Sequence, residues 1–174
     1  MFTNLEPQNP ARLFGASTKE TNTMKTRIKI ILTLGLALAL PQLAAAAEST
    51  HQADALENLI AIQKSLAADS MGHVTHHAAA IAKAATDHKI NGLSQQAAKQ
   101  AHAVANAKDI KAAREAFKKL NESFEAYLKD HPDKSGKYHV AYCPMAKASW
   151  VQTGNTIANP YFGQSMLTCG TFTH

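Results

Sequence analysis

The stretch DIKAAREAFKKLNESFEAYL, residues 109–128, carries the clearest structural signal in the sequence. Its apolar residues recur three and four positions apart, the spacing of one face of an α-helix. They are Ile110, Ala113, Phe117, Leu120, Phe124 and Leu128. Asp109 precedes them and is a favoured N-cap, because its carboxylate accepts hydrogen bonds from the free N–H groups of a first helical turn. The stretch therefore predicts a long amphipathic helix that needs a partner surface.

Three segments upstream repeat this period and predict three more helices. Their inward-facing residues are Leu56, Leu59, Ile60, Gln63 and Leu66; Val74, Ala78, Ile81 and Ala85; and Ala97, Ala101, Val104 and Ala105. Asp54 with Glu57 resembles a capping box, Ser70 and Ser94 are expected caps, and Asn91-Gly92 is an expected helix end. Four such helices joined by short turns predict an all-α fold, an up-down antiparallel four-helix bundle.

The N-terminal region predicts export. Residues 24–47 combine a basic start, an apolar run over residues 30–40 and four alanines at 44–47, the features of a secretory signal peptide. The apolar run is shorter than the roughly 20 residues of a membrane span, which makes a retained membrane anchor the weaker interpretation. Residues 1–23 are interpreted as disordered, or as a start assigned too far upstream of Met24. Residues 48–174 are the predicted single domain, located in the periplasm.

Charge and motifs argue against several functional classes. Residues 48–174 keep 13 of the 18 Lys and Arg and 11 of the 13 Asp and Glu, without a basic stripe interleaved with aromatic residues, so nucleic-acid binding is not expected. The G-x-S-x-G, H-E-x-x-H, P-loop and dinucleotide-binding motifs are absent, and so is C-x-x-C-H. The sequence predicts a binding protein and not an enzyme; a nucleophile pair of Cys143 and His139 is a weaker hypothesis. No membrane contact is expected after signal cleavage.

Downstream of residue 131 the helical period stops. Residues 138–142 are aromatic and β-branched and are expected to be extended. Residues 143–170 contain Pro and Gly throughout and predict an ordered, irregular loop. The only two cysteines of the chain, Cys143 and Cys169, lie at the two ends of this loop, and each has a methionine close by, Met145 and Met166.

These four sulfurs predict a site for a soft metal ion. Thiolates and thioethers together select Cu(I), and thiolates also bind zinc; silver is a further candidate. Cys143 and Met145 would share a face of an extended backbone, Met166 and Cys169 would share a face of one helical turn, and His139 could add an imidazole. A Cys143–Cys169 disulfide is the open alternative, since exported proteins commonly pair two cysteines. A site that is a disulfide when empty and a dithiolate when loaded is compatible with both.

Histidines form a second candidate site. His73 and His77 are four residues apart on a predicted helix, with His76 between them and His88 on nearly the same line, a spacing that can chelate copper or zinc. A solvated helix flank is the simpler interpretation, because no carboxylate or cysteine joins them at ligand spacing.

The C-terminal motifs resemble a known bacterial family. They are YCPMA at 142–146, Trp150, NPYFG at 159–163 and MLTCG at 166–170, preceded by Asp109 and AREAF at 113–117. The family is a domain of unknown function, found as a stand-alone secreted protein and at the C-terminus of periplasmic adaptor subunits of Cus-type copper and heavy-metal efflux pumps. The similarity covers residues 55–171.

The resemblance implies a periplasmic heavy-metal-binding module, above all for copper. It implies that the metal-binding loop is 138–171, with Cys143, Met145, Met166 and Cys169 as ligands. An efflux-pump adaptor or another copper protein is the implied partner. Trp150, Tyr161 and Phe162 are expected to shield the site from water, and the three histidines at 73, 76 and 77 are outside the family pattern.

Overall fold

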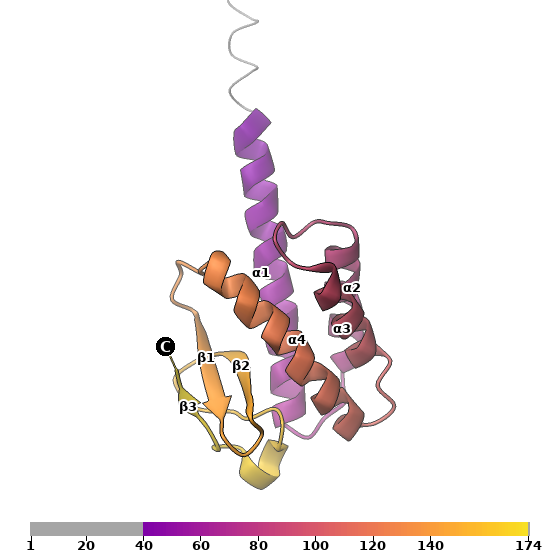
Figure 1. The fold of residues 1–174 in the computed structure, drawn as a ribbon, viewed down its shortest axis with the longest axis vertical. Coiled ribbons are helices and arrows are strands. Elements are labelled where there is room, and N and C mark those ends of the chain that lie inside the picture. Colours follow the sequence, from indigo (N-terminus) through magenta and orange to yellow (C-terminus); the bar gives the residue numbers. More distant parts are fainter. Residues whose placement is uncertain (1–39, 174) are drawn as a thin grey trace, which may run out of the picture. The chain divides into compact units, whose positions relative to one another are not determined.

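The computed structural model describes residues 40–173, with side chains described from residue 50 onward. This part of the chain forms the helices α1 (Leu40–Ala67), α2 (Val74–Thr86), α3 (Gln95–Ala105) and α4 (Ile110–Asp130), the strands β1 (Tyr138–Cys143), β2 (Ala148–Thr153) and β3 (Thr171–Phe172), and a 3-10 helix η1 (Gly163–Met166) (Figure 1). The strands form one antiparallel sheet in the order β2-β1-β3. The predicted all-α four-helix bundle is therefore wrong, because the domain is mixed α/β.

The four predicted helices are confirmed, and the residues predicted to face inward are buried except Ala105, Ile110 and Leu128, which are half-buried. In α4 the residues Ala113, Phe117, Leu120 and Phe124 are fully buried. The side chain of Asp109 accepts a hydrogen bond from the N–H of Ala112 at 2.7 Å, and Ser94 accepts one from the N–H of Ala97 at 3.3 Å. These two caps fix the starts of α4 and α3, because they satisfy N–H groups that have no partner within the helix.

Two predicted helix starts and one helix end are wrong. Asp54 lies inside α1, which begins at Leu40, so it forms no capping box with Glu57. Ser70 does not cap α2; its hydroxyl accepts the N–H of Gly72 at 3.0 Å within the preceding turn. α2 ends at Thr86, before Asn91-Gly92. A short polar side chain bonds to whichever backbone group is nearest, which makes it an ambiguous sign of a helix start.

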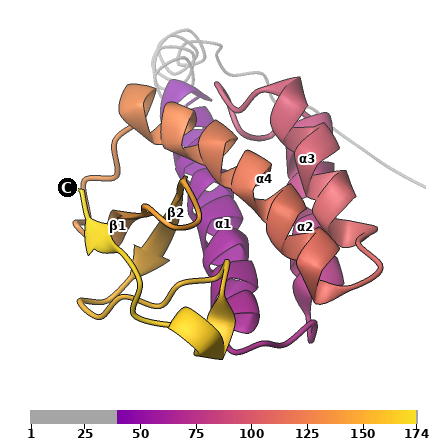
Figure 2. The same ribbon diagram turned by 60° about the horizontal axis from the view of Figure 1, so that its bottom comes forward.

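The sheet lies beside α1 and α4, on the side away from α2 and α3 (Figures 1 and 2). β2 contacts both α1 and α4. The buried side chain of Asn121, in α4, accepts a hydrogen bond from the N–H of Val151 at 3.1 Å. β2 is an edge strand, and a helix side chain thereby provides the hydrogen-bond partner for one of its outward-facing N–H groups.

The segment 143–170, predicted to be an irregular loop, contains β2 and η1 and is followed by β3. Its Pro and Gly residues mark the ends of short elements: Pro144 opens the β1–β2 turn, and Gly154, with φ 81, follows β2. Trp150, Val151 and Gln152 are all buried, so β2 is covered on both faces. Such a strand lacks the alternation of polar and apolar residues by which a half-exposed strand is recognised.

The predicted N-terminal segments fall largely outside the described residues. Residues 1–23 and 24–39 are not described, and residues 40–47 belong to α1. Among the described side chains, which begin at residue 50, the first buried one is Ala55, seven residues after the predicted cut before Glu48. No helix in the described part of the chain combines the length and apolar character of a membrane span.

Candidate metal site

The fold brings the two thiols of the chain together. Cys143 Sγ and Cys169 Sγ lie 2.8 Å apart, and both cysteines are free. Cys143 is the last residue of β1, and Cys169 lies two residues before β3, so the pairing of these strands joins positions 26 residues apart. Both the metal hypothesis and the disulfide hypothesis require this juxtaposition.

Cys143 lies in a pocket of N–H donors formed by the turn that follows it. Its side chain is fully buried, and its Sγ accepts the N–H of Ala146 at 3.4 Å. Burial raises the pKa of the Cys143 thiol, but hydrogen bonds from the Cys169 thiol and from the N–H groups of Ala146 and Met145 outweigh it, and the pKa falls below its usual value. Cys143 is therefore the more readily deprotonated of the two thiols, and the thiolate is the form that binds metals.

Cys169 shares a hydrogen bond with Cys143. The hydrogen bond between the two sulfurs, followed by burial, raises the pKa of the Cys169 thiol above its usual value. The two thiols are therefore unequal: the pKa of Cys143 lies below its usual value and that of Cys169 above it.

Asn159 positions the segment that carries Cys169. Its fully buried side chain donates to the carbonyl of Cys169 at 2.7 Å and accepts the N–H of Tyr161 at 2.8 Å. Its own N–H donates to the carbonyl of Leu167 at 2.7 Å. The sequence motif contained this residue but gave it no role; its position directly before Pro160 is the signal that could have identified it, because asparagine side chains in turns bond to neighbouring backbone groups.

Aromatic residues lie beneath the same segment. Gly170 has φ 144, and a Cβ at this position would lie 2.7 Å from Trp150 Cη2, so the indole packs directly against the backbone beside Cys169. Trp150 is fully buried and meets the ring of Tyr161 edge-on, with 5.8 Å between centroids. Phe162 is half-buried and packs against the core. Trp150 and Tyr161 thus line the inner side of the segment that carries Cys169.

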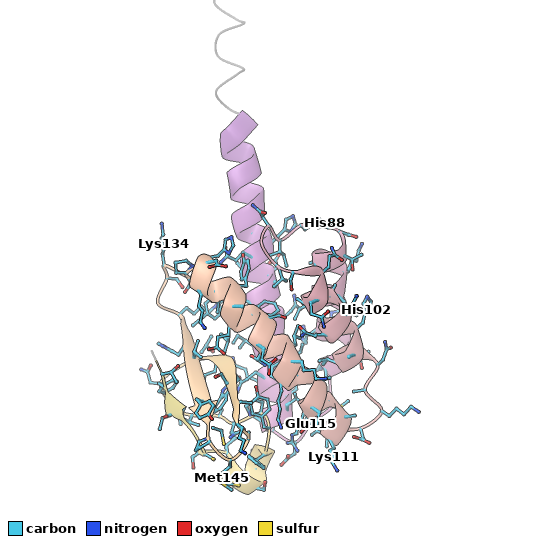
Figure 3. All side chains as sticks on the ribbon, in the orientation of Figure 1. His88, His102, Lys111, Glu115, Lys134 and Met145 are labelled. Atoms are coloured by element: carbon cyan, nitrogen blue, oxygen red, sulfur yellow. The ribbon has the colours of Figure 1, made fainter. Side chains whose placement is uncertain are left out.

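The two methionines lie on the segments that carry the cysteines. Met166 ends η1, and its carbonyl accepts the N–H of Cys169 at 3.0 Å, which makes 166–169 the single turn expected from the sequence. Met145 lies in the β1–β2 turn instead of on an extended strand. It lies at the same end of the sheet as η1 (Figure 3). Met145 is 65% exposed and Met166 36%, so both thioethers are accessible to solvent.

His139 lies farther away. It is four residues before Cys143 on the same strand, a distance of about 13 Å at the rise of a β-strand. Its ring contacts Phe172, with 5.6 Å between centroids. An ion held by the two thiols is therefore beyond the reach of this imidazole, and we leave His139 out of the proposed ligand set.

An ion pair anchors η1 to the helices. Arg114, in α4, donates to the carbonyl of Pro160 at 2.9 Å and to Asp69 at 2.5 Å. Asp69 also accepts the N–H of Gln164 at 3.0 Å, and these two hydrogen bonds, with that from Arg114 the larger, lower the pKa of its carboxyl. Gly163 packs so closely that a Cβ there would lie 2.0 Å from Asp69 Oδ1. Sequence reasoning missed this anchor of Met166, because its partners are far apart in the chain.

The histidines cluster without forming a metal-binding group. The ring centroid of His77 is 6.4 Å from that of His73 and 5.3 Å from that of His76. His77 Nδ1 lies 2.7 Å from Asn58 Oδ1, and burial followed by repulsion from the other two rings lowers its pKa. His88 lies beyond the end of α2. Among the described residues, no set of three or more His, Cys, Asp or Glu could hold a metal ion.

Comparison of the chain with models of protein families, with curated proteins and with solved structures finds no match. The function is therefore argued from the site itself. Its chemistry is that of two adjacent sulfurs, one of which accepts a backbone N–H, with two accessible thioethers on the same segments.

Proposed function

We propose that this protein binds Cu(I) in the periplasm and sequesters the ion or delivers it to a partner. The proposed ligands are Cys143, Cys169, Met145 and Met166. One observation carries the proposal: two free thiols from distant segments lie 2.8 Å apart, and each segment also presents an accessible methionine. We propose a binding function and no catalytic one.

The donor set favours a soft, low-coordinate ion. Thiolates and thioethers are the ligands that select Cu(I), and silver shares this preference. Structural zinc sites take four ligands from Cys, His and carboxylates. In the part of the chain that the structure describes, the two thiols have no third such residue at hand. Copper is therefore favoured over zinc.

The position of the site suits an ion that must leave again. Cu(I) bound to neutral thioethers at the surface could transfer to an incoming ligand before the buried Cys143 thiol becomes exposed. The resemblance to the domain attached to copper-efflux adaptors supports an efflux-pump adaptor or another copper protein as the recipient. Both partners stay part of the proposal.

A competition titration with a chromogenic Cu(I) chelator tests the proposal. Reduced, oxygen-free protein is expected to remove one Cu(I) per chain from the chelator, and X-ray absorption of the loaded protein should show a shell of sulfur. Cys143→Ser or Cys169→Ser should abolish this competition. The Met145→Leu, Met166→Leu double variant should weaken it about tenfold, a loss of about 1.4 kcal/mol. Met71→Leu, the same substitution at a half-buried methionine outside the site, serves as the matched control.

The same titration addresses the alternative, a disulfide-stapled interaction module. The closeness of the two sulfurs also suits a disulfide, which would stabilise the fold by about 3 kcal/mol in the chain-entropy estimate. Protein that takes up no copper after mild reduction, and whose thiols reoxidise completely, would support this module and end the copper proposal.

A further inference from the structure

The two sulfurs of the pair differ in access from solvent. Cys143 is 0% exposed and belongs to the hydrophobic core, whereas Cys169 is half-buried and only packs against that core. A thiol or disulfide from outside the protein can therefore reach Cys169 and not Cys143. Reaction at a sulfur depends on such access.

The two sulfurs also differ in their hydrogen-bond donors. Cys143 Sγ accepts the N–H of Ala146, and the β1–β2 turn that carries this donor is fixed by the register of the hairpin, in which Cys143 pairs with Ala148. This donor is a backbone group and stays in place whichever sulfur of the pair has reacted. Negative charge left on Cys143 would thus be received by an N–H group already in place.

We infer that this pair performs thiol–disulfide exchange in a fixed direction, with Cys169 as the sulfur that is attacked and Cys143 as the leaving group. The partner this geometry fits is an exported dithiol reductant that presents its nucleophilic thiolate at the protein surface. The inference concerns the same two cysteines as the proposed function, but it does not require that copper binds.

The exchange proceeds in two balanced steps. The thiolate of the reductant attacks Cys169 Sγ of the oxidised protein, a mixed disulfide forms, and the Cys143–Cys169 bond breaks with its electron pair on Cys143 Sγ. The second thiol of the reductant then attacks the reductant's first sulfur, which is bonded to Cys169 in the mixed disulfide, and expels Cys169 as a thiolate. Two electrons and two protons pass to the protein, and the reductant leaves as its disulfide.

This exchange would control access to the proposed copper site. The disulfide has no thiolate to offer a metal, and a mixed disulfide at Cys169 blocks one of the two anchoring ligands. Only the fully reduced pair can bind Cu(I). Loading would then require prior reduction at Cys169.

The position of Lys147 allows a direct test, because trypsin cleavage there separates the cysteines into peptides 138–147 and 148–174. Metal-free protein is oxidised with glutathione disulfide, treated briefly with limiting glutathione, quenched with acid, alkylated after unfolding and digested. We expect at least about tenfold more glutathione on peptide 148–174 than on 138–147, with the alkyl group on Cys143. Equal labelling, a preference for peptide 138–147, or failure to form the disulfide would overturn the inference.

Single-cysteine variants give a second, independent measurement. In the folded state Cys143→Ser, which keeps Cys169, should react with an aromatic disulfide at least about tenfold faster than Cys169→Ser, which keeps Cys143. In denaturant the two rates should agree, since the difference arises from burial. Equal rates in the folded state would contradict the assignment.

The outcomes are separable from those of the copper experiment. All exchange measurements use metal-free protein, so directional labelling without copper binding would sustain this inference and remove the proposed function. Copper binding together with equal labelling of the two peptides would sustain the proposed function and overturn this inference.

Discussion

Replacing Asn159 with alanine should loosen the link between the two cysteine segments. The substitution removes the hydrogen bonds to the Cys169 carbonyl and from the Tyr161 N–H, at 2.7 and 2.8 Å, and leaves both backbone groups without that partner in a buried region. An orphaned buried polar group costs about 1–3 kcal/mol. Allowing for partial relaxation, we expect Asn159→Ala to lower the free energy of unfolding by about 2–4 kcal/mol.

Urea unfolding followed by circular dichroism measures this loss. With a slope of about 1–3 kcal/mol per molar urea, the midpoint should fall by about 1–2 M. The matched control is Asn155→Ala in the same connecting segment, where the side chain is exposed and the free energy of unfolding should stay within about 0.5 kcal/mol of wild type. Disulfide formation between Cys143 and Cys169 should also slow in the Asn159 variant, because Cys169 is no longer held in place. Equal stability of the two variants would refute the role assigned to Asn159.

Three further predictions concern the surroundings of the site. Gly170→Ala should destabilise the fold by about 1–3 kcal/mol in thermal or urea unfolding, because its Cβ would overlap the Trp150 ring; Gly136→Ala, whose Cβ meets open space, is the control and should cost less. Asp69→Asn should lower the melting temperature at pH 7. The hydrogen bond from Arg114 depresses the pKa of this carboxyl in the folded state. The ionised carboxylate therefore stabilises the fold above the unfolded pKa of about 3.9, and this contribution is lost as pH falls through the folded pKa. The melting temperatures of variant and wild type should converge in acid, and a difference that persists there would contradict the ion pair. A protein that begins at residue 48 should unfold at the same urea concentration as the full chain, because the first buried side chain described is Ala55; a clear loss of stability would show that residues before 48 contribute to the fold.

The sequence predicted the components of the candidate site better than their arrangement. The two Cys–Met pairs were identified from sequence spacing alone, and the turn over 166–169 was expected. His139 was included as a possible ligand, although the extended backbone expected for residues 138–142 already places it about four strand residues, roughly 13 Å, from Cys143. The role of Asn159 and the anchor formed by Arg114 and Asp69 were missed, because each hydrogen bond joins segments that are distant in sequence.

By itself, the sequence determined the four helices and the faces they bury. Helical periodicity is a local property: residues three and four apart share a face whatever the rest of the chain does, and Phe117, Leu120 and Phe124 are buried as that rule requires. Only the tertiary structure decided that a sheet, and not helix–helix contact, fills the space beside α1 and α4. The tertiary structure also decided that Cys143 lies next to Cys169. The two residues meet because β1 pairs with β3, and local sequence does not specify which strand another strand pairs with.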